Sequence, residues 1–370
     1  MEAIAALIIS KTQAFCKDLR MIDRYRTDEK HFSREGKLSF DTTVQLLLSN
    51  MQHSTQVEIY KRMKINDLEQ VMVSSFCKNR YKIEADLFED LYKLGVQTIE
   101  EEGQEVLTKW HGFRLRAIDG TSIQLPDTKS IRKEFGLHKN GSKTGVITET
   151  PMARLLLEED VLNKTFTRAE LFPITKSELS AAYDWLLTPR SKGDLTLFDR
   201  NFDSFMCMYL LSESKKHFVI RMKLVTNVVK AFVASGKQDQ IVTFTASSVL
   251  NYEDITIPKG ETIQVRLVRV ELSSGEIEVL ATSLFDTTAF PPELFGPLYN
   301  LRWGVETAID VLKNKFAMMR FLAHKAQGIY QEVYATLFNY NLHQIIVSAA
   351  QDVVNEDVTK KKSNSNTIKK

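Results

Sequence analysis

The sequence has little cysteine, and its few cysteines form no recognisable site. Cys16, Cys77 and Cys207 are the three cysteines among 370 residues. They lie far apart, are odd in number and belong to no CxxC or Cys/His cluster, so neither a disulfide framework nor a structural zinc site is expected. The seven histidines form no HExxH or HxxxH pair. Cysteine usage therefore favours a reducing, cytoplasmic location.

Long apolar runs and nucleotide-binding loops are also absent. No run approaches about 18 uninterrupted apolar residues, and the opening MEAIAALIISK lacks the basic start and cleavage site of a secretion signal. No GxxxxGK[ST] loop is present, so we expect neither a membrane partner nor a nucleotide cofactor. The net charge of +2 is too small to indicate a nucleic-acid-binding protein. Residues 299–325 carry a local excess of positive charge, which either a solvated face or DNA binding explains.

The length favours two or three domains, or one domain with a large insertion. Residues 1–105 are expected to be helical, because apolar positions recur every three or four residues in FDTTVQLLLSNM and ADLFEDLYKLGV. Within them, INDLEQVMVSSFCKNRYKI is compatible with a helix-turn-helix: a short helix, a tight connection near Val73 and Ser74, and a second helix bearing Lys78 and Arg80. A plain helical bundle with a basic surface would give the same pattern.

The pattern changes to period two after residue 105. In residues 106–225 strands come first and then alternate with helices, which indicates a mixed α/β structure. FRLRAIDGTSIQLPD is predicted as a strand, a glycine turn and a second strand. Residues 226–285 are strand-rich and suggest an inserted β-module. Residues 286–350 return to helix, and the polar residues 351–370 are expected to be a disordered tail.

Two acidic residues follow apolar runs that are predicted strands. Asp119 closes LRAID, and Asp199 closes LTLFD before Arg200. Side chains at strand ends of layered α/β folds converge at the rim of the sheet, where ligands commonly bind. Two carboxylates there repel each other unless a cation lies between them, and oxygen ligands suit a hard divalent cation. Arg200 could contact a phosphate or pair with a nearby acid.

The stretch YNLRWGVETAIDVLK is predicted to be one helix with a polar edge. At about 100° per residue, Tyr299, Arg302, Glu306 and Lys313 share a stripe about 60° wide beside an apolar stripe. A surface salt-bridge pattern is the simpler interpretation. Alternatively, Glu306 joins the two aspartates to hold two Mg²⁺ ions that act on a phosphodiester. Arg302 and Lys313 would then hold backbone phosphates, and Tyr299 would donate to a phosphate or stack on a base.

The pattern Y-x2-R-x3-E-x6-K resembles the signature of the insertion sequence 4 family of DDE transposases. AIDGT and LFDR resemble the blocks around that family's first two catalytic aspartates, and FSREGKLSFDTTVQLLLSN resembles its usual opening. The resemblance implies an RNase H-like core that a β-rich insertion interrupts, preceded by a helical DNA-binding domain. It implies catalysis by Asp119, Asp199 and Glu306 with two Mg²⁺ ions, which Mn²⁺ could replace.

The resemblance also implies a reaction sequence and partners. The enzyme would bind the terminal inverted repeats of a mobile element, nick the DNA, form and open a hairpin, and join the 3′ ends to target DNA. Family members act as homodimers in the DNA complex, in the bacterial cytosol. The alternative is an inactive or domesticated relative that binds DNA without cutting, for example as an inhibitor of transposition.

Two features limit these expectations. Some family members stack a tryptophan of the insertion on a flipped base, but residues 226–285 contain none; Phe244, Tyr252 or Phe285 could substitute. IDGT is also similar to the DxDGT motif of haloacid dehalogenase-like phosphatases. That motif needs a nucleophilic aspartate where this chain has Ala117, so the phosphatase interpretation is set aside.

Overall fold

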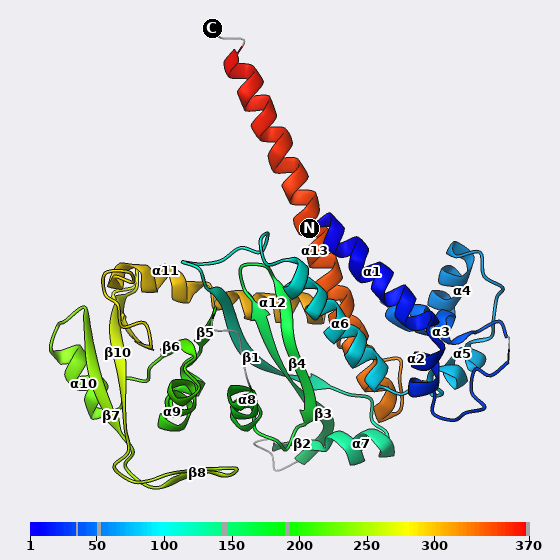
Figure 1. Ribbon diagram of the computed structural model, residues 1–370. Helices are drawn as coiled ribbons and strands as arrows, with labels where there is room; N and C mark the ends of the chain where they lie inside the picture. The colour runs from blue at the N-terminus through cyan, green and yellow to red at the C-terminus, as the bar shows by residue number, and fades with distance from the viewer. Residues whose placement is uncertain (35, 50–52, 142–146, 189–192, 368–370) are drawn as a thin grey trace. The chain divides into compact units, whose positions relative to one another are not determined.

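The computed structural model describes the chain except for residues 35, 50–52, 142–146, 189–192 and 368–370 (Figure 1). The chain divides into two compact units. Unit 1 comprises Met1–Leu107, Ile123–Ala153 and Asp310–Lys370, and unit 2 comprises Thr108–Ser122 and Arg154–Ile309. Residues 123–153 and 310–370 therefore group with the N-terminal helices, whereas the predicted domain bounds grouped residues 123–153 and 310–350 with the core.

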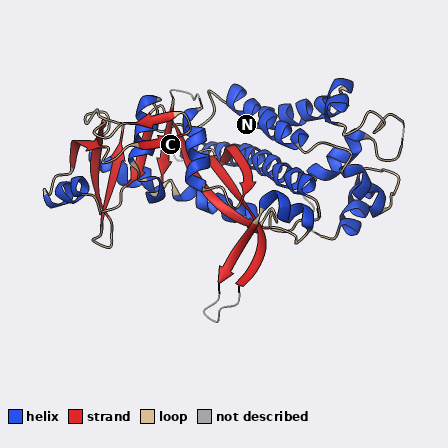
Figure 2. Cartoon of the chain, turned by 90° about the horizontal axis from the view of Figure 1, so that it is seen from below, coloured by secondary structure: helices blue, strands red, loops and turns tan. Residues whose placement is uncertain are grey.

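Unit 1 is built mainly from helices, as its N-terminal sequence pattern predicts (Figure 2). The N-terminal helices are α1 (Glu2–Lys17), α2 (Leu19–Tyr25), α3 (Phe40–Leu48), α4 (Thr55–Ile65), α5 (Val73–Arg80) and α6 (Asp86–Glu102). The C-terminal helix α13 (Ala326–Thr367) packs against α1, α3 and α6. Ile329, Val333 and Leu337 are fully buried at a spacing of four residues, which forms an apolar stripe along α13.

The helix-turn-helix was predicted with a tight connection near Val73 and Ser74, and this part of the prediction is wrong. α4 ends at Ile65, residues 66–72 form an irregular connection, and α5 begins at Val73. Asp67 has a φ of 52°, and the N–H of Leu68 donates to the carbonyl of Met63 at 2.8 Å, which turns the chain out of the helix. The short helix expected over INDLEQ and the tight turn near Val73 are therefore absent from this described segment.

Unit 1 also holds a short helix and a β-ribbon. Helix α7 (Lys129–Phe135) precedes β2 (Leu137–Gly141), and β2 pairs antiparallel with the first part of β3 (Ile147–Asp160) (Figure 2). At the other end of the unit, α13 continues to Thr367, where a disordered tail was expected. Residues 351–354 are exposed, so the helix propagates there from its packed part without further packing. Residues 368–370 lie outside the described residues.

Unit 2 is organised around a mixed sheet. Its strands are β1 (Arg114–Gln124), β4 (Thr165–Pro173), β5 (Asp194–Phe198), β6 (His217–Arg221), β7 (Asp239–Thr245), β10 (Thr262–Glu271), β11 (Ile277–Thr282) and the second part of β3. Neighbours follow the order β4-β3-β1-β5-β6-β11-β10-β7. β1, β5 and β6 are parallel, and β11, β10 and β7 join antiparallel. The predicted mixed α/β architecture is thus confirmed.

Helices α8 (Glu178–Leu187), α9 (Phe205–Glu213) and α10 (Asn227–Ala234) contribute buried side chains to the same core as this sheet. Residues 226–285 contain the predicted strands, including the short β8 (Leu250–Tyr252) and β9 (Ile255–Ile257), and begin with α10. β11 pairs with β6, so the strands of this segment extend the central sheet. This pairing buries apolar residues of β10 and β11 in the common core.

Two local predictions around the candidate site are also corrected. β1 runs without a turn through Gly120. The helix predicted over residues 299–313 is interrupted: α11 (Phe295–Asn300) and α12 (Trp303–Asn314) are separated by a turn at Leu301 and Arg302. The position of Gly120 inside β1 matters for the site, because a glycine inside a strand often marks a close approach by another group.

Candidate active site

Two parallel strands of unit 2 bring Asp119 and Asp199 to the same level. In the register of β1 and β5, Ala117 is paired with Leu197. Asp119 and Asp199 each lie two residues further along, on strands about 4.8 Å apart by ordinary sheet geometry. β5 ends at Phe198, and the carboxylate of Asp199 accepts a hydrogen bond from the N–H of Asn201 at 2.9 Å. The parallel alignment thus places the two acids side by side, with Asp119 inside β1 and Asp199 directly after the end of β5.

The electrostatics of Asp119 show that other acids lie near it. Its Oδ1 accepts a hydrogen bond from the N–H of Gly120 at 2.9 Å. Burial, followed by the negative charge of Glu178, raises the pKa of Asp119 to about 7, and Glu306 and Asp199 add to the rise. All three predicted catalytic acids therefore belong to one interacting group within unit 2.

Glu306 lies in the first turn of α12 and is held by Arg302. Nη1 of Arg302 is 3.0 Å from Oε1 of Glu306, and the Arg302 side chain is only 4% exposed against 40% for Glu306. The guanidinium also lies 4.5 Å from the ring centre of Trp303. Burial lowers the pKa of Arg302, but the charges of Tyr299, Glu306 and Asp119 outweigh that effect and raise it overall. Arg302 is thus engaged inside the protein, where it orients Glu306.

Tyr299 is buried as well. Its hydroxyl donates to the carbonyl of Phe198 at 3.2 Å, and burial raises its pKa to about 12. This bond ties α11 to the end of β5, next to Asp199. Arg200 is exposed in the one-turn helix after Asp199, and Lys313 lies at the end of α12, in unit 1. The phosphate-binding roles predicted for these residues stay predictions.

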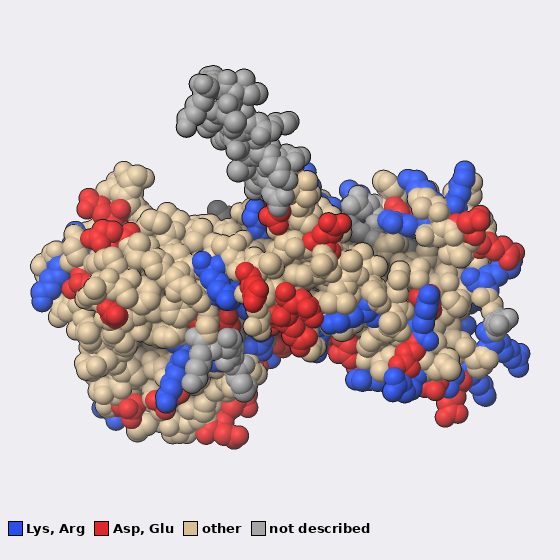
Figure 3. Space-filling model, turned by 45° about the horizontal axis from the view of Figure 1, so that its top comes forward, with Lys and Arg blue, Asp and Glu red and all other residues tan. Residues whose placement is uncertain are grey.

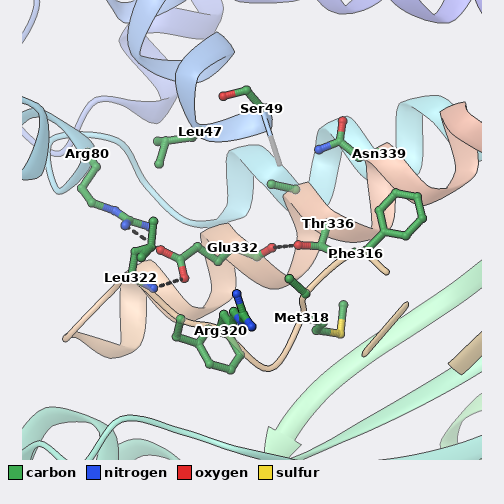
Figure 4. A pocket seen from close by; sticks show the side chains of 13 residues that line it. Leu47, Ser49, Arg80, Phe316, Met318, Arg320, Leu322, Glu332, Thr336 and Asn339 are labelled. Carbon is green, nitrogen blue, oxygen red and sulfur yellow. Dashed lines mark hydrogen bonds and ion pairs between the residues drawn. The ribbon is translucent and has the colours of Figure 1, made fainter. Parts of the chain in front are cut away.

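Lys78 and Arg80, predicted to bind DNA from α5, have different surroundings. Lys78 is exposed, whereas Arg80 is 3% exposed. Nη1 of Arg80 is 2.7 Å from Oε1 of Glu332 on α13, whose Oε2 accepts from the N–H of Leu322 at 2.9 Å (Figure 4). The guanidinium also donates to Gln331. Arg80 therefore joins α5 to α13 beside a small cavity, and this buried network leaves no phosphate-facing donor on its side chain.

Unit 1 has a basic groove that was not predicted from the sequence. It has a volume of about 610 Å³ and is lined by Lys30, Arg34, Lys37 and Lys82, among others. Lys37 is paired with Glu69. Figure 3 shows basic and acidic side chains interspersed over the N-terminal helices, so the groove is not visible as a bias of the whole region. The run of cations in residues 30–37 is the one signal that could have indicated it.

A fourth acid, Glu178, also escaped sequence analysis. It occupies the first position of α8, and a Cβ atom built on Gly120 would lie 2.4 Å from its Cδ. Burial and the charge of Asp199 raise the pKa of Glu178, whereas Arg154 lowers it. An acid in the first turn of a helix is common for reasons of helix stability, so its position in the sequence carries no functional signal.

The donor chemistry of this group fits a hard divalent cation. All its acids offer carboxylate oxygens, the ligands that Mg²⁺ and Mn²⁺ prefer. The pKa of Asp119 is raised first by burial and then by repulsion from the other acids, and a cation would relieve that repulsion. Among the residues that the structure describes, no three His, Cys, Asp or Glu side chains already form a metal-binding cluster. The acids therefore lie near one another, but their side chains are not arranged to coordinate one ion together.

None of the described helices is both long and apolar enough to cross a membrane. Comparison with known proteins gives the family. The transposase DDE domain family matches residues 110–342. The transposase InsG for insertion sequence element IS4 of Escherichia coli (strain K12) is 24% identical over 237 residues, which is 63% of this chain and 52% of InsG. The chain thus spans about half the length of that relative.

A solved structure gives a weaker similarity. A chain of the piggyBac transposase synaptic complex with hairpin DNA has a TM-score of 0.49 and 11% identity, and covers 91% of this chain and 74% of that one. The family match and the similarity to InsG confirm the resemblance found in the sequence motifs. The chain belongs to the transposase DDE domain family, and its similarity to InsG agrees with the resemblance to the insertion sequence 4 family.

Proposed function

We propose that the protein is an active DNA transposase that binds the terminal inverted repeats of its element, cleaves the DNA and joins the 3′ ends to target DNA. The observation that carries this proposal is the mutual proximity of three acids: Asp119 inside β1, Asp199 directly after β5, and Glu306 in the first turn of α12. The mixed sheet with parallel β1 and β5 is compatible with an RNase H-like core.

Asp119, Asp199 and Glu306 would hold the divalent ions, two Mg²⁺ by the family's chemistry. When bound, these ions would activate the attacking oxygen and stabilise the leaving oxygen of the phosphodiester. Asp119 must lose its proton to act as a ligand, so its pKa of about 7 makes ion binding stronger as the pH rises through neutrality.

The neighbouring residues hold the acids in place. Arg302 fixes the direction of Glu306 through their ion pair, and Tyr299 fixes the end of β5 through the carbonyl of Phe198. The Tyr299 contact is buried, so it is shielded from water, whereas the ion pair joins the buried Arg302 to the partly exposed Glu306. We expect the acids to keep their positions when DNA and ions bind.

DNA would be held by exposed or partly exposed cations. In unit 1, Lys313 lines a hollow with Asn314 and Arg320, and the basic groove carries Lys30 and Lys82. In unit 2, Arg200 is exposed next to Asp199. Phosphate contacts of this kind position DNA without reading its sequence. Recognition of the terminal repeats, the hairpin step, a homodimer in the DNA complex and action in the bacterial cytosol complete the proposal.

The test is excision of a marker flanked by the element's terminal repeats in bacterial cells. We expect the native protein to excise the marker, and Asp119→Asn and Glu306→Gln to abolish excision at equal protein levels. Asp254→Asn, an exposed acid of unit 2, is the matched control and should excise normally. Native protein that binds the repeats but never excises the marker would instead support the non-cutting alternative.

A further inference from the structure

Glu178 reaches the predicted metal site because residue 120 is glycine. Gly120 follows Asp119 directly in β1, and a Cβ atom there would lie 2.4 Å from Cδ and 2.6 Å from Oε2 of Glu178. Such distances are far below van der Waals contact, so any larger residue would displace the carboxylate. The missing side chain at Gly120 is therefore what lets the carboxylate of Glu178 lie against the main chain beside Asp119.

The position of Glu178 is fixed by α8. Ser177 caps this helix by accepting a hydrogen bond from the N–H of Ser180 at 3.0 Å. The helix is anchored in the core of unit 2 by buried residues that include Ala181, Ala182 and Trp185. Glu178 thus projects from a packed helix, and sites built on packed elements hold their geometry better than sites on loops.

The charges around Glu178 favour a cation. Among the neighbouring acids, Glu178 acts more strongly on Asp119 than Glu306 or Asp199 does. Arg154 attracts Glu178, and Arg302 pairs with Glu306. Four ionised carboxylates and two guanidinium groups leave a charge of −4 + 2 = −2, which one divalent cation would balance.

We propose that Glu178 is a fourth carboxylate of the metal site and binds a hard divalent cation, Mg²⁺ or Mn²⁺, together with Asp119. This inference rests on the proposed function of the three predicted acids. It adds to them a residue that neither the sequence motif nor its spacing indicates. Gly120 is then a positioning residue, since it acts through Glu178.

The inference can be tested by a binding measurement that does not depend on catalytic activity. Isothermal titration calorimetry measures the binding of MnCl₂ to the full-length protein at pH 8. We expect Glu178→Gln to bind Mn²⁺ about 10- to 100-fold more weakly than the native protein. Glu213→Gln removes an exposed acid at the end of α9 and should leave the affinity unchanged. Equal affinities of Glu178→Gln and Glu213→Gln would overturn the inference.

Gly120→Ala provides a second, independent test. It should also weaken Mn²⁺ binding, and the double variant Gly120→Ala/Glu178→Gln should bind no more weakly than Glu178→Gln alone, because both changes remove the same carboxylate. Fully additive losses would show that Gly120 acts by another route. Urea unfolding in EDTA checks the fold, and Glu178→Gln should be at least as stable as the native protein because it removes a repelling charge.

Asp199→Asn separates this inference from the proposed function. If Asp199→Asn and Glu178→Gln both bind Mn²⁺ like the native protein, the proposed metal site itself is wrong. If Asp199→Asn loses affinity and Glu178→Gln does not, only the role of Glu178 is wrong. We expect both variants to lose affinity.

Discussion

Replacing Asp119 by asparagine should stabilise the protein in the absence of divalent ions. Burial and neighbouring acids raise the pKa of Asp119 from its ordinary value of 3.8 to about 7. Between these values the folded protein holds a proton that the unfolded chain releases, so stability falls as the pH rises toward 7. A pKa difference of about 3 corresponds to about 4 kcal/mol of unfolding free energy. This is an upper limit, since neighbouring acids share the repulsion.

Asp119→Asn removes the charge that causes this loss. Its free energy of unfolding should exceed that of the native protein by up to about 4 kcal/mol at pH 8 and by about 2 kcal/mol at pH 5. The assay is urea unfolding in EDTA, followed by tryptophan fluorescence. Trp110, Trp185 and Trp303 all lie in unit 2, so the signal reports the unit that contains the site.

Asp254→Asn serves as the control for loss of one negative charge. Asp254 is exposed in the turn between β8 and β9, far from any acid of the site in sequence. Its unfolding free energy should match the native value at both pH values. The reasoning is refuted if Asp119→Asn is no more stable than Asp254→Asn at pH 8, or if its advantage is the same at pH 5 and pH 8.

Three further predictions concern the residues around the acids and the DNA contacts. Tyr299→Phe loses the hydrogen bond to the carbonyl of Phe198 and should lower the free energy of unfolding by about 1 kcal/mol in the same assay. An unchanged free energy of unfolding would show that this bond does not stabilise the protein. Lys313→Gln should lower the slope of log affinity against log salt for terminal-repeat DNA by about one, measured by fluorescence anisotropy. Lys30→Gln in the basic groove should lower the slope in the same way, whereas Lys230→Gln, at an exposed lysine, should leave it at the native value. If Lys313→Gln and Lys30→Gln also keep the native slope, neither lysine contacts a phosphate.

Sequence patterns located the principal acids because the signals are local. Asp119 and Asp199 each follow an apolar run that forms a strand, although β1 continues past Asp119, and the parallel pairing of β1 with β5 sets the two acids side by side. Glu306 was singled out from the polar stripe that it shares with Arg302 and Lys313. In the structure Arg302 lies in the turn before α12 and forms the ion pair with Glu306 that the simpler interpretation expected. The catalytic roles of these acids remain for the experiments above.

The errors arose where tertiary contacts override local preference. Gly120 was predicted as a turn because glycine favours turns, yet it lies inside β1, where its small size admits Glu178. The burial of Arg80 could not be predicted either, because its partner Glu332 lies 252 residues away in the chain. Periodicity carries no information on either contact.

The extent of the sheet was missed for a similar reason. The strands of residues 226–285 were recognised, but the pairing of β11 with β6 depends on partners that alternation does not specify. The basic groove combines residues 30–34 and 36–38 with Lys82 and other residues of the α5 region. Neither arrangement could be read from one segment alone.

The central claim is tested most directly by cleavage of a labelled duplex that carries the element's terminal repeat. Purified native protein should cut the duplex at the repeat boundary in Mg²⁺ and not in EDTA, and Asp254→Asn should match it. Asp199→Asn should bind the duplex with native affinity and leave it intact. Cleavage by Asp199→Asn at the native rate, or cleavage by the native protein in EDTA, would contradict a metal-dependent carboxylate site at Asp119, Asp199 and Glu306.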